Sequence, residues 1–168
     1  MRLLSIDPAL RNTGYAIIEQ VKPREYRALA YGVVKNPARL LQTQCLVEIR
    51  KNLVQVVERF SPECCAVESV IYVQSYKTAI IMGAARAAAL LPAAEAGMPV
   101  FEYSPRRVKQ VIVGRGGAEK QQVAFMVRSL LHLEETPPPD AADALAIGLA
   151  HFHFLEKKEL GLESAVQV

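Results

Sequence analysis

Residues 137–147 read Pro137-Pro138-Pro139-Asp140-Ala141-Ala142-Asp143-Ala144-Leu145-Ala146-Ile147. Proline is disfavoured inside a helix but can precede one, and the alanine- and leucine-rich run that follows favours helix. Asp140 and Asp143 are three residues apart, which places both carboxylates on one face of the first turn. The apolar residues through Leu149 predict a buried helix that extends from Asp140 to about residue 157.

Two interpretations of this acidic pair are open. Aspartate is favoured at a helix N-cap and in the first turn, so Asp140 and Asp143 could serve only to cap the helix. Two carboxylates at the end of a buried helix also repel each other unless a cation lies between them. The choice between a cap and a metal site depends on where the other isolated acids fall.

Length and composition predict one globular domain. The chain has 168 residues, of which 51% are hydrophobic, and we expect a single domain over residues 1–158 with a polar tail over 159–168. The net charge of +3 only hints at a polyanionic partner. The three cysteines, two of them adjacent, give no disulfide framework and fit a reducing cytoplasm. Arg86 and Pro92 interrupt the alanine-rich run near residue 85, so no membrane span is expected.

The order of the elements predicts a mixed α/β layered fold. Three strands come first and are followed by a long amphipathic helix; shorter strands then alternate with helices. The expected strands cover residues 3–6, 13–18, 26–34, 64–67 and 100–103, which makes a five-stranded sheet. The expected helices cover residues 38–60, 75–96, 118–131 and 140–157, with a short helix or turn over 105–113. The strand–helix–strand crossover makes the fourth strand parallel to its neighbour.

Two further acids follow predicted strands. Asp7 ends the first strand and Glu68 ends the fourth; taken singly, Asp7 before Pro8 is typical of a turn, and Glu68 could be a solvated strand end. If the two strands are adjacent and parallel, both carboxylates project at one edge of the sheet, where Asp140 and Asp143 can cover them. Four clustered acids are costly without cations, and an oxygen-only donor set suits Mg²⁺ or Mn²⁺. Two such ions can promote phosphodiester cleavage.

Several motifs occur together along the chain. The longer ones are Ser5-Ile6-Asp7-Pro8 with Thr13-Gly14-Tyr15, then Ala66-Val67-Glu68, then Asp140-Ala141-Ala142-Asp143-Ala144-Leu145-Ala146. The shorter ones are Gly83 with Ala85-Arg86, Phe101-Glu102-Tyr103, Val108-Lys109-Gln110 and Gly117-Ala118-Glu119-Lys120. In order and spacing, over about residues 1 to 155, this set resembles the RuvC family of Holliday junction resolvases.

The resemblance implies an RNase H-like fold, a homodimer and a Mg²⁺-dependent endonuclease of recombination and repair. Such an enzyme makes paired, symmetric nicks in four-way junction DNA. The family's catalytic, metal-binding carboxylates correspond to Asp7, Glu68, Asp140 and Asp143. We expect two Mg²⁺ ions per subunit, with Mn²⁺ able to substitute. The implied partners are the branch-migration proteins RuvA and RuvB, the implied location is the cytoplasm, and no membrane association is expected.

A basic segment precedes the last helix. It contains Arg106, Arg107, Lys109, Arg115 and Lys120 against the single acid Glu119. The segment could be a solvated helix face, but the glycines at 114, 116 and 117 would let backbone approach a phosphate closely. We expect all five cations to contact DNA. The resemblance places Lys109 and Lys120 beside the catalytic acids and gives Lys120 a catalytic role.

The chain departs from the family pattern at three positions. Ala9 replaces the usual glycine after Asp-Pro, Ile71 replaces a phenylalanine three residues after Glu68, and Ser75 replaces an asparagine. We expect Tyr72 to stack on a base at the crossover, with Ile71 and Tyr76 as alternatives. The alanine-rich segment 84–89 is expected to form part of the dimer interface.

Three other functions were weighed. An actin-like ATPase also begins with an Asp-containing hairpin, but it needs a second lobe for which 168 residues leave no room. A non-catalytic junction-binding protein would be expected to lack one of the four acids. An RNase H-like nuclease acting on RNA fits the acids equally well, and the lysine segment and the prolines favour the junction resolvase over it.

Overall fold

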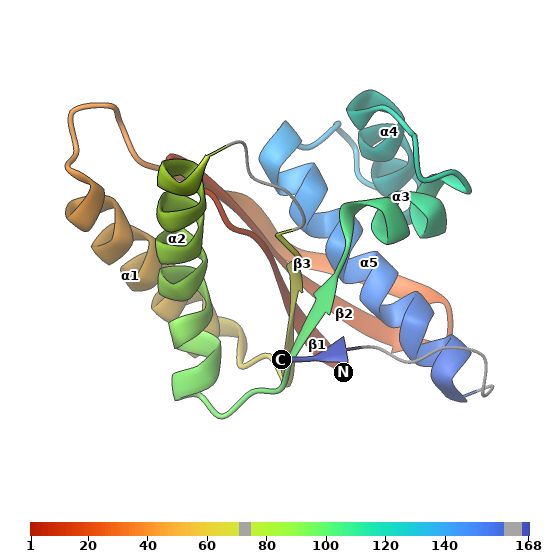
Figure 1. The fold of residues 1–168 in the computed structure, drawn as a ribbon. Helices are drawn as coiled ribbons and strands as arrows, with labels where there is room; N and C mark the ends of the chain where they lie inside the picture. Colours follow the sequence, from red (N-terminus) through yellow and green to blue (C-terminus); the bar gives the residue numbers. More distant parts are fainter. Residues whose placement is uncertain (71–74, 160–165) are drawn as a thin grey trace.

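A computed structural model describes residues 1–70, 75–159 and 166–168 (Figure 1). Its strands are β1 (Arg2–Asp7), β2 (Asn12–Lys22), β3 (Glu25–Lys35), β4 (Cys64–Glu68), β5 (Val100–Tyr103) and β6 (Val166–Gln167). They form one sheet in the order β3-β2-β1-β4-β5-β6, in which β1 is antiparallel to β2 and parallel to β4. The five predicted strands and the parallel crossover are confirmed. The two-residue β6, which pairs with the edge of β5, was not predicted.

The helices are α1 (Gln42–Phe60), α2 (Tyr76–Glu95), α3 (Pro105–Val113), α4 (Lys120–Leu130) and α5 (Pro139–Glu159). Helices α1 and α2 cover one face of the sheet, and α3, α4 and α5 lie on the other (Figure 1). Helix α1 begins at Gln42, later than the predicted residue 38. The cause is Arg11, whose guanidinium donates to the carbonyls of Pro37 and Leu40 at 2.8 and 3.1 Å and holds this segment as a turn.

The two faces of the sheet bury alternate residues of each strand, as the pleat requires. In β1, Leu4 and Ile6 pack in the core under α1 and α2, whereas Leu3 packs in the core under α5. In β4 the same alternation places Cys65 with α1 and α2, and Cys64 with α5. Within β1 and within β4, successive residues therefore lie on opposite faces of the sheet.

Helix α5 lies across β1 and β2 with its backbone very close to the sheet. Gly148 makes this approach possible, because a Cβ there would lie 2.8 Å from Ser5 Oγ and 2.7 Å from Ile18 Cδ1. Along α5 the side chains from Ala144 to Ala150 are buried almost without exception, which confirms the predicted buried helix. A helix seated this deeply fixes where its first turn meets the sheet.

Helix α2 is long and apolar enough, by length and composition alone, to cross a membrane. In this fold it packs against α1, with Ala85, Ala88 and Ala89 in the core. Arg86, in the middle of the same helix, forms a half-buried ion pair with Glu102 of β5 at 3.3 Å. One side of α2 therefore packs in the core of the fold.

Candidate active site

The ends of β1 and β4 bring two of the predicted acids together. The two strands pair in parallel as far as Ile6 and Val67, so Asp7 and Glu68 stand side by side one residue beyond the last pair. Asp7 follows Leu3 and Ser5 at alternate positions, and Glu68 follows Cys64 and Ala66 in the same way. Both carboxylates therefore project on the α5 side of the sheet.

The first turn of α5 brings the other two acids to the same place. Gly14 of β2 pairs directly with Asp7, and any Cβ at position 14 would collide with the backbone carbonyl of Asp140. The missing side chain lets the start of α5 rest on the ends of β1 and β2. We call the resulting group of Asp7, Glu68, Asp140 and Asp143 the acidic edge.

The acids interact electrostatically with one another. Burial, followed by the charge of Asp143, raises the pKa of Asp7 to about 6. Burial, followed by the charges of Asp7 and Asp143, raises the pKa of Glu68 to about 7. Burial and mutual repulsion thus disfavour the ionised form of each carboxylate, which is the usual condition of a site that accepts cations.

Two predicted lysines reach the acidic edge. The Lys120 ammonium, in the first turn of α4, donates to Asp143 Oδ2 at 2.7 Å, and this bond raises the lysine's pKa. The charge of Lys120 acts against the rise in the pKa of both Asp7 and Glu68, and Lys109 has the same effect on Glu68. The structure therefore brings Lys109 and Lys120 to the acids, as the spacing of the motifs implied.

A divalent cation fits this site by donor chemistry, because carboxylate oxygens are the ligands of Mg²⁺ and Mn²⁺. Among the residues that the structure describes, no three acidic, histidine or cysteine side chains are arranged closely enough to enclose an ion. Asp143 is instead engaged by Lys120. The four acids thus form an open cluster with a lysine ammonium as its nearest counter-charge.

Arg86 has a role at this site that was not predicted from the sequence. Its guanidinium donates to the backbone carbonyl of Glu68 at 2.6 Å and pairs with Glu102, so α2 holds the end of β4 in place. A single arginine inside an alanine-rich helix was the available signal, since a charge in such a position usually has a buried partner.

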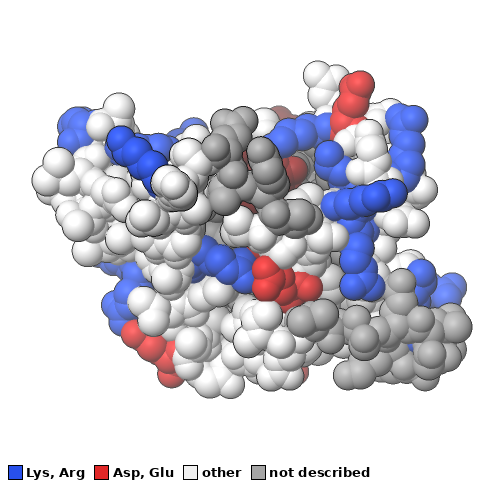
Figure 2. Space-filling model, viewed as in Figure 1, with Lys and Arg blue, Asp and Glu red and all other residues white. Residues whose placement is uncertain are grey.

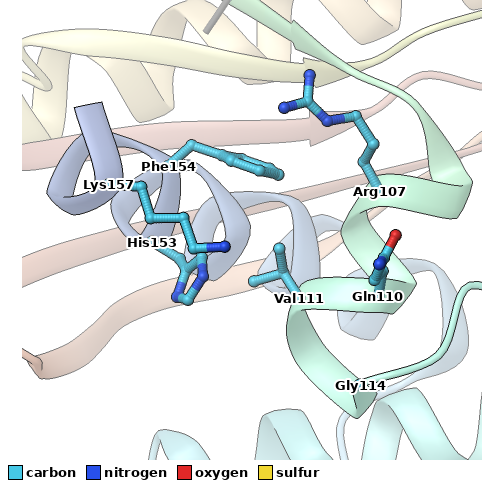
Figure 3. A pocket seen from close by; sticks show the side chains of 7 residues that line it. All are labelled: Arg107, Gln110, Val111, Gly114, His153, Phe154 and Lys157. Atoms are coloured by element: carbon cyan, nitrogen blue, oxygen red, sulfur yellow. The ribbon is translucent and has the colours of Figure 1, made fainter. Parts of the chain in front are cut away.

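The other three predicted DNA-contacting cations are Arg106, Arg107 and Arg115, and their surroundings differ from those of the two lysines. Arg107 lies over the Phe154 ring, 4.5 Å from its centroid, and lines a 330 Å³ pocket with Lys157 and His153 (Figure 3). Phe154 is eleven residues beyond Asp143, about 16 Å along the helix. Arg115 donates to Gln122 Oε1 at 2.8 Å, and Arg106 is exposed. Lys and Arg side chains gather over α3 and α4 (Figure 2), and among the five predicted cations Lys109 and Lys120 are the ones whose charges act on Asp7 or Glu68.

The remaining predictions concern single residues. Tyr72 and its alternative Ile71 lie outside the described residues. Tyr76 begins α2 with its ring 79% exposed, a position from which it can contact a partner. Ala9 is not among the described non-glycine residues with positive φ, so the turn after Asp7 accommodates its Cβ.

The sequence is similar to those of one protein family. The family model described as crossover junction endodeoxyribonuclease RuvC matches residues 3–151. A protein of that name from Akkermansia muciniphila is 53% identical over 166 residues, which is 94% of this chain and 99% of the relative. Another from Syntrophomonas wolfei is 42% identical over 154 residues, or 91% of this chain and 89% of the relative.

Comparisons of structure give the same result. The chain is similar to T. thermophilus RuvC in complex with Holliday junction substrate, with a TM-score of 0.88, 34% identity, and coverage of 100% of this chain and 99% of the other. A second structure of Thermus thermophilus RuvC gives a TM-score of 0.84 at 35% identity, with full coverage of both chains. A yeast mitochondrial Holliday junction resolvase, 15% identical with a TM-score of 0.63 and coverage of 96% and 84%, shares the fold.

Proposed function

Because the chain belongs to the RuvC family of crossover junction endodeoxyribonucleases, we propose that the acidic edge is its catalytic centre. The protein is a nuclease that binds four-way junction DNA and resolves it by hydrolysing phosphodiester bonds, in recombination and repair. One observation supports the site above the others: acids from three distant segments meet on the same side of the sheet, and Asp7, Glu68 and Asp143 influence one another's charge.

The family's activity is metal-dependent. We assign Mg²⁺ as the ion, two per subunit, with Mn²⁺ able to substitute and the acidic edge as the ligand set. When bound, such ions activate a water molecule and stabilise the leaving oxygen. The raised pKa values of Asp7 and Glu68 support this assignment, because a cation between the carboxylates would offset both the burial and the mutual repulsion that raise them.

The lysines supply fixed positive charge. Lys120 is protonated at neutral pH, and its bond to Asp143 Oδ2, which raises the lysine's pKa further, orients that carboxylate. An ammonium at this position attracts the scissile phosphate and stabilises the charge that develops on it. Lys109 adds a second positive charge near the end of β4, where it acts on Glu68.

A second copy of the chain completes the proposed enzyme, since a four-way junction offers two equivalent strands to cut. The expected interface over residues 84–89 is wrong in part, because Ala85, Ala88 and Ala89 are buried within the subunit. The outward side of α2 is a different row of residues, which we call the α2 stripe: Tyr76, Ile80, Gly83, Ala87 and Leu91. Its members are three or four residues apart and exposed, and the small residues at its centre would let a symmetry-related helix approach closely.

Two further assignments follow the family. Association with RuvA and RuvB stays a prediction of the resemblance. A cytoplasmic location is supported by Cys45, Cys64 and Cys65, which are free, buried thiols and so suit a reducing compartment.

The variant Asp143→Asn tests the catalytic assignment. It keeps the size of the side chain and removes one charge, so the fold and metal-free junction binding should survive, because less repulsion remains at the acidic edge. The rate of nicking with Mg²⁺ should fall by roughly two or more orders of magnitude, because a preorganised charge that stabilises the transition state is lost. Thermal unfolding, a gel shift without divalent ions and a nicking assay measure the three properties.

Glu95→Gln is the matched control, since it removes one carboxylate from an exposed ion pair with Arg50. It should nick as the wild type does. Near-normal nicking by Asp143→Asn would return Asp143 to a helix-capping role. Competition between junction DNA and an RNA–DNA hybrid, with the same metal, separates the resolvase from an RNA-processing nuclease.

A further inference from the structure

A cavity of about 480 Å³ opens beside the acidic edge. Its floor and walls are apolar and come from Ala124 and Phe125 of α4 and from Pro137 and Pro139 before and at the start of α5. Lys120 and Asp143, which are bonded to each other, also line it. The cavity is therefore continuous with the proposed catalytic centre and shares two of its side chains.

Helical spacing explains why one side of α4 faces the cavity and is not buried in the core. Gln121, Ala124 and Phe125 lie on one side of α4, while Val123 and Val127 on the other side are buried against the core. The Phe125 ring is left 64% exposed at the cavity wall. A large aromatic side chain that faces a concave apolar surface beside a functional centre is typical of a ligand site.

The chemistry of the walls selects the ligand. A phosphate would lose its hydration against the proline and phenylalanine rings of the walls. A flat, neutral, partly polar ring would stack on Phe125 and still find hydrogen-bonding groups, because Gln121 and Thr136 also line the cavity. In a DNA substrate the group with these properties is a nucleobase.

We propose that this cavity receives an unstacked nucleobase of the strand being cut, next to the scissile phosphate. The proposal rests on the function assigned above, since it takes the acidic edge as the place of cleavage. Unstacking a base costs least where pairing is already interrupted, as at the crossover of a four-way junction. The Gln121 amide and the Thr136 hydroxyl would then contact the edge of the base and contribute to the choice of cutting sequence.

A mutant cycle between protein and DNA tests this cavity. The variant Phe125→Ala is compared with wild type in single-turnover nicking of an intact junction, and of junctions with an abasic site at each nucleotide around the cut in turn. On the intact junction the variant should be slower by about tenfold or more, the usual effect of losing one aromatic–base stack. At one abasic position the two proteins should differ by no more than about twofold, because the base that Phe125 contacts is already missing.

Two matched variants accompany the cycle. Phe125→Tyr keeps the ring and should retain most of the rate, which a loss of local packing would not explain. Val47→Ala, at a position on α1 that is 62% exposed, should nick as wild type does on every junction. Thermal unfolding and sedimentation velocity are measured for each variant.

Three results would overturn the proposal. The first is a wild-type nicking rate for Phe125→Ala on the intact junction. The second is an equal loss of nicking rate at every abasic position. The third is a change in the sedimentation of Phe125→Ala, which would show that Phe125 contacts a second copy of the chain. None of them depends on Asp143. A failure of the catalytic assignment would appear instead as nicking by Asp143→Asn, so the two failures can be told apart.

Discussion

His151 lies at the centre of a buried polar group in α5. The Tyr103 hydroxyl is 2.8 Å from its Nδ1, and Cys64 Sγ is 3.8 Å from its Nε2. Burial lowers the pKa of His151 to about 4 and raises that of the Cys64 thiol to about 12. The histidine is therefore neutral in the folded protein and contributes to the packing of the core.

This residue should make the fold sensitive to acid. In the unfolded chain His151 binds a proton with its ordinary pKa of 6.5, whereas in the folded protein it does so only near 4. Its contribution to stability is therefore complete above about pH 6.5 and is lost as the pH falls toward about 4, up to about 3 kcal/mol. Denaturant unfolding of wild type and His151→Gln across this range measures the difference.

The comparison with the variant matters because other groups titrate in the same range. The raised pKa values of Asp7 and Glu68 favour the folded state as the pH falls, which is the opposite sign. Both carboxyls are present in wild type and in His151→Gln. The difference between the two proteins in the slope of unfolding free energy against pH therefore isolates His151. Equal slopes for wild type and His151→Gln would show that the histidine does not carry this dependence.

At the scale of the element, α2 has two faces with different tasks. Its inner face supplies the buried alanines and Arg86, which holds the end of β4 through the Glu68 carbonyl. Its outer face is the α2 stripe, with Ile80 69% exposed and Leu91 46% exposed. The helix that supports a catalytic residue is thus also the helix that we expect to meet the second subunit.

Ile80→Asp should break the proposed dimer. A carboxylate at a helix–helix contact would be buried without a partner, which costs several kcal/mol, so the variant should sediment as a monomer at concentrations where wild type is dimeric. Paired nicking of a junction should become single nicking, because each subunit then cuts alone. Sedimentation velocity and a supercoiled or closed junction substrate that reports paired cuts measure the two effects.

The matched control is Val47→Asp on α1, which introduces the same charge at a site 62% exposed and outside the α2 stripe. It should leave both sedimentation and paired nicking unchanged. A monomeric wild type that still makes paired nicks would count against the dimer, as would an unchanged Ile80→Asp variant.

For the molecule as a whole, the charge is unevenly placed. The net charge is only +3, yet Lys and Arg side chains gather over α3 and α4 (Figure 2), the helices that carry Lys109 and Lys120. A cationic surface beside a cluster of acids lets a polyanion approach a site that would otherwise repel it.

Junction binding should therefore depend on salt through individual cations. Arg106→Ala and Arg115→Ala should each weaken metal-free binding and reduce the slope of log affinity against log salt by about 0.9, if each side chain contacts one phosphate. Arg50→Ala, which removes a cation paired with Glu95 on another face, should leave the slope unchanged. Slopes for Arg106→Ala and Arg115→Ala that match wild type would place both side chains off the DNA.

Much of the fold could be predicted because its signals are local. The apolar run that ends at Asp7, the prolines before Asp140 and the helical spacing of α1 each depend on neighbours in the chain, and each is found close to its predicted place. The predicted parallel crossover also placed Asp7 and Glu68 at one edge of the sheet, where the structure has them. The family motifs then connected these acids with nuclease chemistry.

Only the tertiary structure decided what depends on distant segments. The bond between Lys120 and Asp143 joins residues 23 apart, the turn that delays α1 is held by Arg11, and β6 exists because β5 offers a free edge. The outward face of α2 and the cavity beside Phe125 likewise depend on which neighbours cover each helix. Such features follow from packing between elements, whose free energy no short stretch of sequence carries by itself.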